Sequence, residues 1–202
     1  MHIARGASGN DITFRDVDWS ARPLDAAPYY GLRYTHFFSA LPAWAVAVDY
    51  THYKVYAKTG TTVQVQGVWN GLAVNGAAPL VDYVQQFEIS HGVNMLSING
   101  IYRWLDMTLL SGRLQPYAGA GLTRYWMHSE NMVDGVFHET GYQSSGHGFQ
   151  VLAGASYKIT PQVYAFAEAK FNRAKANVDI ADGQAESRLR TLHASVGVSY
   201  AF

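Results

Sequence analysis

The stretch Leu192-His193-Ala194-Ser195-Val196-Gly197-Val198-Ser199-Tyr200-Ala201-Phe202 decides the fold class, because its side chains alternate in polarity. The even positions are apolar, and the odd positions are small or polar. A β-strand points successive side chains to opposite faces, so one face here is apolar and the other polar. The length exceeds the roughly five or six residues of an average soluble strand and suits a tilted strand crossing a bilayer. The stretch therefore predicts a membrane-spanning strand with lipid outside and a polar lumen inside.

The composition of the whole chain agrees with such a strand. Charged residues make up only 15% of the 202 residues, against about a quarter in soluble domains. The 14 tyrosines, nine phenylalanines and five tryptophans suit the two interfaces of a bilayer. The absence of cysteine excludes disulfides and thiolate chemistry, and the net charge of zero argues against broad nucleic-acid binding. No apolar run is long enough for a transmembrane helix.

Eight strands can be traced, and the connections between them alternate between long and short. The predicted strands cover residues 11–20, 29–38, 43–56, 83–104, 114–128, 146–159, 163–177 and the segment after Asp182-Gly183. A change of phase near Arg15-Asp16 indicates a bulge in the first strand. Long connections follow strands one, three, five and seven, which places the termini in the periplasm and the long loops outside the cell.

We therefore predict an all-β fold with one domain, residues 1–202, forming an eight-stranded antiparallel up-and-down transmembrane β-barrel. Closure would leave no strand edge in hydrocarbon, and side chains would fill so small a lumen. The predicted location is the outer membrane of a bacterium, with outer-membrane lipids and lipopolysaccharide as partners and the barrel-assembly machinery needed for insertion. Met1 to Arg5 lack the apolar run of a secretion signal, so we expect a mature form.

Catalytic consensus motifs are missing, but polar residues gather on the predicted third and fourth strands: Asp49, His52, Lys54, Glu88 and His91. If their hairpin is centred in the connecting loop, antiparallel pairing places His52 near Glu88 and Asp49 near His91. The parity of His52 and Lys54 points them outward at the outer rim. Cations at that rim can bind the phosphates of lipopolysaccharide.

Other ionisable residues have a simpler interpretation. Arg33, Arg103, Glu168 and Lys170 have the parity of the lumen, where a narrow interior requires charges to pair, so we expect a structural plug.

Three histidines lie in or beside the third long loop, near two glutamates, and a loop with such residues can bind a metal. The spacing of this group matches no compact metal-ligand pattern, so we interpret its members as solvated loop residues. They are His128, His138, His147, Glu130 and Glu139.

Several segments carry a family resemblance. They are Pro28-Tyr29-Tyr30-Gly31-Leu32-Arg33, Asp49-Tyr50-Thr51-His52-Tyr53-Lys54-Val55-Tyr56-Ala57, His91-Gly92-Val93-Asn94-Met95-Leu96 with Asn99, Tyr102-Arg103-Trp104, Pro116-Tyr117-Ala118-Gly119-Ala120-Gly121-Leu122 and the terminal strand. Together they resemble the rhizobial-type outer-membrane lipid A oxidase family. The aromatic C-terminal residue also resembles the ending of bacterial outer-membrane barrels. Members of that oxidase family look like enzymes that oxidise the proximal glucosamine of lipid A to 2-aminogluconate with dioxygen.

The resemblance implies an oxidase at the outer rim. In that case His52 or His91 would act as the base at the anomeric hydroxyl, and Asp49 or Glu88 would orient the imidazole. The substrate-binding candidates are Lys54, Arg33 and Arg103, with Lys54 on a lipid A phosphate. Dioxygen chemistry needs a cofactor, and a divalent metal ion on Asp49, Glu88 and His91 is the candidate.

The sequence leaves it open whether the chain is an enzyme. The main alternative is a non-enzymatic structural or interaction barrel of the OmpA-like type. A narrow conduit for small apolar molecules that opens sideways through the wall is a third hypothesis.

Overall fold

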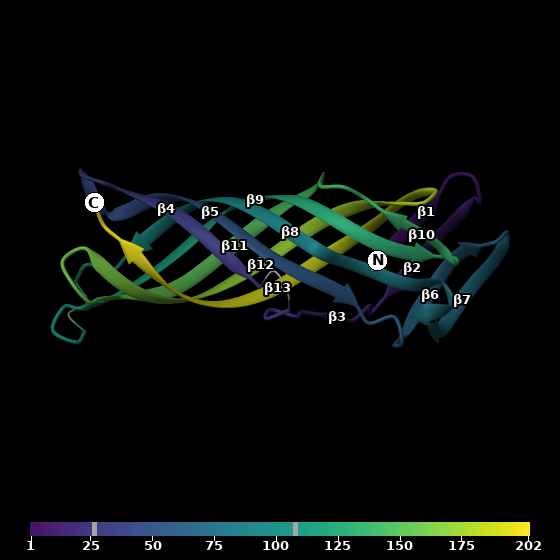
Figure 1. The fold of residues 1–202 in the computed structure, drawn as a ribbon, viewed down its shortest axis with the longest axis horizontal. Coiled ribbons are helices and arrows are strands. Elements are labelled where there is room, and N and C mark those ends of the chain that lie inside the picture. The colour runs from purple at the N-terminus through teal and green to yellow at the C-terminus, as the bar shows by residue number, and fades with distance from the viewer. Residues whose placement is uncertain (26–27, 107–108) are drawn as a thin grey trace.

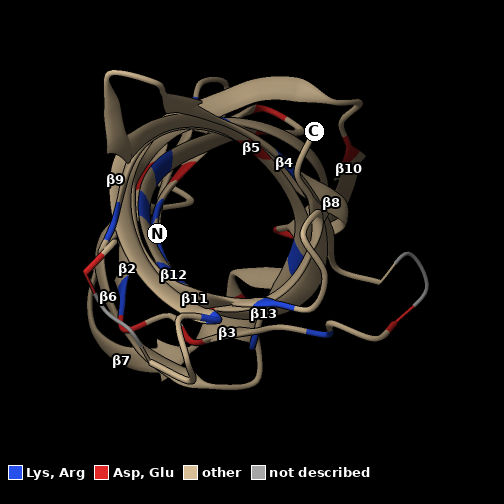
Figure 2. Cartoon of the chain, turned by 90° about the vertical axis from the view of Figure 1, so that its left-hand side faces the viewer, with Lys and Arg blue, Asp and Glu red and all other residues tan. Residues whose placement is uncertain are grey.

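A computed structural model describes residues 1–25, 28–106 and 109–202, so the middle of the connection after the fourth predicted strand lies outside the described residues. One antiparallel sheet of thirteen strands curls round on itself, and Figure 2 shows the resulting ring of strands from one end. No helix in the described part is long and apolar enough to cross a membrane.

Seven long strands form the wall and follow one another as antiparallel neighbours (Figure 1). They are β4 (Tyr30–Phe38), β5 (Leu41–Ala57), β8 (Val84–Arg103), β9 (Leu114–Val133), β11 (Gln143–Lys158), β12 (Val163–Ile180) and β13 (Gly183–Tyr200). These strands confirm the second to eighth predicted ones. Several extend beyond the predicted ends, because the connections at one end of the wall continue as paired strands.

In Figure 1 the long axis of the molecule is horizontal. We call the left-hand end, which holds the C-terminus, the lower end, and the right-hand end the upper end. Two upper connections that the sequence predicted as loops contain strands. Residues 58–82 form β6 (Thr62–Trp69), β7 (Leu72–Pro79) and the 3-10 turn η1 (Leu80–Asp82), and β10 (Val136–Glu139) pairs back onto β9.

The predicted first strand, residues 11–20, is broken. It divides into β2 (Asn10–Arg15) and β3 (Trp19–Ser20), and the new strand β1 (His2–Arg5) precedes it. Asp16 lies between the two pieces with a φ of 60°, a left-handed conformation that a continuous strand cannot contain. The two pieces consequently pair with different partners: β2 with β1 and β6, and β3 with β5.

The prediction of eight strands in a closed barrel with both termini at one end therefore needs correction. Strand β1 pairs with the upper end of β13, so the N-terminus lies in the upper half, away from the C-terminus (Figure 1). Within the described ranges no registered pair joins β4 to β13, and β13 meets β1 only through Gly183 to Glu186. The break in the first predicted strand explains this, because that strand would have paired with both edges. The two edges still approach each other near the lower end, where the rings of Tyr34 and Phe202 stack 6.2 Å apart.

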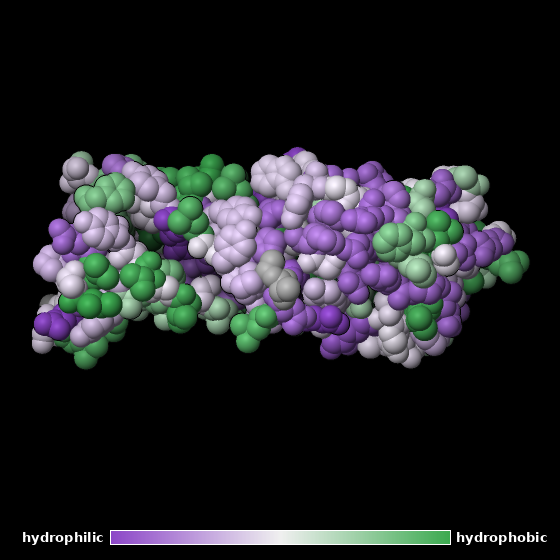
Figure 3. Space-filling model, viewed as in Figure 1, coloured by the Kyte–Doolittle hydropathy of each residue, from purple (hydrophilic) through white to green (hydrophobic). Residues whose placement is uncertain are grey.

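The wall changes polarity along its axis, and β12 shows the change within six residues. In the lower half Phe171 is exposed on the outside, while Lys170 is buried on the inside. Further up, Arg173 and Lys175 are exposed outside and Ala174 is buried inside. Figure 3 shows the same contrast, with apolar side chains gathered mostly over the lower half and hydrophilic ones over the upper half.

The interior of the upper half is a packed apolar core. Its largest fully buried members include Ile3, Phe14, Tyr53, Phe87, Tyr125 and Met127. The lower half therefore has an apolar outer surface (the apolar belt), compatible with lipid, around a polar lumen. The upper half has the arrangement of a soluble protein, with an apolar interior and a polar outer surface.

Candidate functional site

Four charged side chains meet in the lumen of the lower half. Arg33 on β4 donates to Asp49 Oδ2 on β5 through Nε at 3.0 Å and to Glu168 Oε2 on β12 through Nη1 at 2.6 Å. Lys170 Nζ on β12 donates to the same Asp49 oxygen at 2.8 Å. The carboxylate side chains are 2% and 0% exposed. Two cations and two anions make a neutral, buried network, as burial requires.

This lumen network crosses the interior from β4 and β5 to β12. It contains the pairing expected for Arg33, Glu168 and Lys170, but Arg103 lies elsewhere. Arg103 Nε donates to the carbonyl oxygen of Pro42 at 2.8 Å, and its guanidinium lies 3.8 Å from the centre of the Phe37 ring. Arg33 and Arg103 therefore lie away from the outer rim where the sequence placed a substrate.

His52 lies on the outer side of β5, where neighbouring side chains cover it. Its ring stacks on Tyr30 with centroids 5.0 Å apart, and its Nδ1 hydrogen-bonds to Asn94 Oδ1 at 3.0 Å. Tyr50 Oη donates to the same amide oxygen. The His52 Nε2 atom is buried and has no hydrogen-bond partner among the described residues. An enclosed ring of this kind is poorly placed to take a proton from a sugar hydroxyl.

The predicted cross-strand neighbours on β5 and β8 are wrong. The observed partners are His52 with Asn94, Asp49 with Ser97 and Tyr56 with Glu88. The connecting segment is not a symmetric hairpin, since β6 leaves the β5–β8 ladder to pair with β2.

The structure also separates Asp49 from the other predicted metal ligands. Asp49 is bound in the lumen by Arg33 and Lys170. Glu88 and His91 line a groove on the outer wall of the upper half. The predicted metal set of Asp49, Glu88 and His91 is therefore not brought together.

An open groove of about 630 Å³ brings Lys54, Glu88 and His91 together with Arg22, Tyr56 and Glu130. The guanidinium of Arg22 lies 4.4 Å from the centre of the Tyr56 ring. Burial raises the pKa of the Tyr56 phenol, and Arg22 acts in the opposite direction. The phenol therefore stays neutral and able to donate a hydrogen bond near pH 7.

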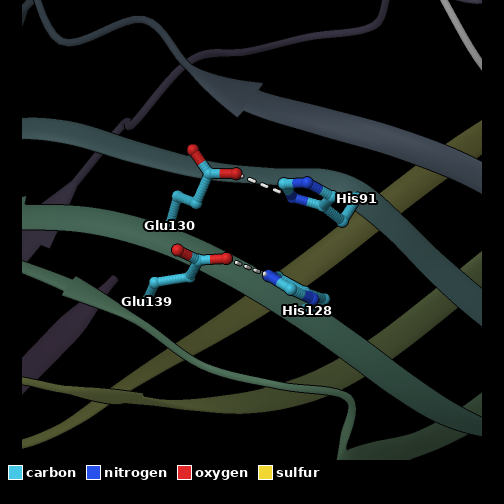
Figure 4. Close-up of side chains that lie close together, drawn as sticks. All are labelled: His91, His128, Glu130 and Glu139. Atoms are coloured by element: carbon cyan, nitrogen blue, oxygen red, sulfur yellow. Dashed lines mark hydrogen bonds and ion pairs between the residues drawn. The ribbon is translucent and has the colours of Figure 1, made fainter.

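Beside this groove two histidines and two glutamates converge, as Figure 4 shows. His91 Nδ1 lies 2.7 Å from Glu130 Oε1, and His128 Nε2 lies 2.9 Å from Glu139 Oε1. The two imidazole rings stack with centroids 4.2 Å apart. We call these four residues the His/Glu cluster. They come from β8, β9 and β10.

Sequence reasoning placed three cluster members in a solvated loop. The structure continues β9 through His128 and Glu130 and pairs Glu130 with Glu139 on β10. One signal was available in the sequence: His128 and Glu130 are two positions apart, so any strand through them puts both side chains on one face. The approach of His91 depends on a register break in β8, which sequence parity does not reveal.

The chain is similar in fold to a solved structure, the crystal structure of Neisserial surface protein A (NspA). The TM-score is 0.51 at 20% sequence identity, and the match covers 96% of this chain and 94% of that one. No curated protein matches the sequence.

A family model described as Opacity family porin protein matches residues 39–202. That range contains every long strand of the wall from β5 onward. The lipid A oxidase family, which the sequence motifs resemble, is not the family that matches. The match and the fold place the protein in the bacterial outer membrane, and the chain belongs to the Opacity family of porin proteins.

Proposed function

We propose that this chain is a non-enzymatic structural barrel that holds phosphorylated lipids of the outer leaflet against its wall. The observation that carries the proposal is a band of cations directly above the apolar belt. Its members face outward on four adjacent strands, and we call them the basic band: Arg124, His147, Arg173, Lys175, Arg188 and Arg190.

The basic band begins where the apolar belt ends on each strand. On each strand an exposed apolar side chain of the belt lies two positions from the first basic one, and on β9 the exposed Trp126 follows two positions beyond Arg124. The pairs are Leu122 and Arg124 on β9, Phe149 and His147 on β11, Phe171 and Arg173 on β12, and Leu192 and Arg190 on β13. If acyl chains surround the belt, these cations lie at the level of the lipid head groups.

Like charges stand opposite one another in this band. Lys175 pairs in register with Arg188, and Arg173 pairs with Arg190. Lys175 forms an ion pair with Glu186 at 2.9 Å, whereas Arg173, Arg188 and Arg190 have none within the described ranges. Like charges directly opposite each other destabilise a sheet. A lipid phosphate between them would remove that repulsion and accept bidentate hydrogen bonds from arginine.

The lumen network supports a structural rather than a conducting role. Four side chains connect opposite parts of the lower wall through bonds of 2.6 to 3.0 Å. A small barrel filled in this way is stabilised by its interior and offers ions no wide path.

Replacing Arg173 and Arg190 together by Gln should weaken binding of bisphosphorylated lipid A by about 30-fold, because each cation near an anionic lipid contributes about 1 kcal/mol. Binding to the detergent-solubilised full chain is measured against dephosphorylated lipid A and inorganic phosphate. Arg113→Gln, which removes an exposed cation near the lower end, should leave affinity unchanged. Equal binding of phosphorylated and dephosphorylated lipid A would refute the proposal, and equal binding of inorganic phosphate would reduce it to a phosphate site.

Oxidation of lipid A is a second candidate function. What favours it is that Lys54, Glu88 and His91, three residues singled out from the sequence, line one groove on the outer wall. In such a reaction the anomeric carbon would lose two electrons and gain an oxygen from water. Dioxygen would take up two electrons and two protons and leave as hydrogen peroxide.

Lipid A from aerated cells that carry the gene should then gain the mass of one oxygen atom relative to cells without it. His91→Gln should abolish the gain, because the groove would lose its imidazole base. His36→Gln, which removes an exposed histidine of the lower half, should retain it. Mass spectrometry of extracted lipid A gives the answer. An unchanged mass under aeration would eliminate the oxidase and leave the structural barrel.

A further inference from the structure

We propose that the His/Glu cluster on the outer wall binds one divalent cation of the zinc class. The inference is independent of the lipid-binding proposal, since it concerns a different part of the wall. It rests on how His91, His128, Glu130 and Glu139 converge.

The ligand atoms of the four side chains are already close together. One nitrogen or carboxylate oxygen from each lies within 4.8 Å of all the others. In a tetrahedral zinc site with bonds of about 2.0–2.2 Å, neighbouring ligand atoms are about 3.4 Å apart. The cluster therefore needs a contraction of roughly 1 to 1.5 Å at its widest separation. Rotamer adjustments of exposed side chains can supply this, because His91 and Glu139 are 55% and 51% exposed.

The donor set selects the class of metal. Two imidazole nitrogens with two carboxylate oxygens suit Zn²⁺, Co²⁺ and Ni²⁺. Calcium and magnesium prefer six or more oxygen ligands and make little use of imidazole. The side chains also keep the site open to solvent on one side, so a bound ion can exchange.

The register of the sheet adds an electrostatic reason for a cation to bind at the cluster. Glu88, Glu130 and Glu139 are direct neighbours across β8, β9 and β10. Glu88 and Glu130 line the same outer groove, and Glu130 and Glu139 both belong to the cluster. Carboxylates directly opposite each other repel. A divalent cation between Glu130 and Glu139 offsets that repulsion.

The surroundings hold the ligands in place. Ser90 Oγ donates to Glu130 Oε1 at 3.0 Å, and Tyr142 Oη donates to the carbonyl oxygen of His91 at 2.6 Å. The Tyr142 ring also packs edge-on against His128 at 5.4 Å. Such outer hydrogen bonds and contacts orient metal ligands and maintain affinity.

A break in the ladder places His91 within reach of the cluster. Between the pairs Glu88–Glu130 and Gly92–His128, β8 has three residues where β9 has only Ser129. The extra residues form a bulge that puts His91 beside Glu130, and bulges commonly redirect a side chain in this way. The cluster is thus built by a specific irregularity of the sheet.

The test uses the untagged full chain in detergent after treatment with a chelator. Zinc titrated by calorimetry should bind at one site per chain, and Co²⁺ should give the visible absorption bands of a four-coordinate ion. His128→Gln should weaken zinc binding by at least the 10- to 100-fold that loss of an outer-shell partner causes. Zinc should also raise the unfolding temperature of the unmodified chain, because a ligand that binds only the folded state stabilises it.

His147→Gln is the matched control, since it removes another exposed, outward-facing histidine that lies outside the cluster. It should bind zinc like the unmodified chain. Unchanged zinc affinity in His128→Gln, or calcium binding as tight as zinc binding, would overturn the proposal. Circular dichroism of both variants establishes that the sheet is intact, and Glu139→Gln provides a second variant at the exposed side of the site.

Discussion

Asp49→Ala should lower the free energy of unfolding by about 3–5 kcal/mol, the range for removing one partner of a buried ion pair. Asp49 accepts hydrogen bonds from both Arg33 and Lys170. Without it, Glu168 alone faces two cations, and the network carries an uncompensated positive charge away from water. The network also joins β4 to β12 across the seam where, in the described part of the chain, no registered pair links β4 to β13.

Urea unfolding of the barrel in lipid vesicles, followed by tryptophan fluorescence, measures the change. Asp106→Ala removes an exposed carboxylate in a turn at the lower end and should shift stability by less than about 0.5 kcal/mol. The double variant Asp49→Ala with Lys170→Met restores neutrality and should recover part of the loss. A single variant as stable as the unmodified chain would show that the network contributes little.

Most of the wall could be predicted from the sequence because the lipid-facing strands repeat every second residue. The alternation from Leu192 to Tyr200 is reproduced by β13, whose apolar positions are exposed. The first strand could not be predicted, because Asp16 adopts a positive φ that parity does not report. The upper connections were missed for a related reason: β6, β7 and β10 stand above the belt, where no lipid enforces a strict pattern.

The candidate site was only partly accessible to sequence reasoning. Parity correctly placed His52 and Lys54 on the outer face, because parity fixes the face of the sheet. It could not fix which residues are neighbours across strands, since that depends on register. The pairing of His52 with Asn94 belongs to the unbroken register that runs from Trp44–Tyr102 to Tyr53–Val93. The approach of His91 to Glu130 depends on the register break in β8. The members of the basic band are spread along the sequence, and only the register of the strands shows that they lie side by side.

Gly92→Ala should destabilise the chain by about 3 kcal/mol or more, through backbone strain and overpacking together. Gly92 has a φ of +120°, and a Cβ there would lie 2.0 Å from His52 Cε1. The imidazole cannot easily move, since it is stacked on Tyr30 and hydrogen-bonded to Asn94. Because Gly92 ends the bulge that carries His91, the variant should also weaken zinc binding.

Urea unfolding in lipid vesicles, as for Asp49→Ala, also separates the backbone strain at Gly92 from the steric clash with His52. Gly100→Ala is the matched control on β8: the heavy atom nearest to its added Cβ would be 4.0 Å away, so stability should change by less than about 1 kcal/mol. Adding His52→Ala to Gly92→Ala removes the clash but leaves the positive φ. The double variant should therefore regain the steric part of the loss and keep the backbone part, about 1–3 kcal/mol. If Gly92→Ala is as stable as Gly100→Ala, the bulge relaxes freely, and its role in positioning His91 fails with it.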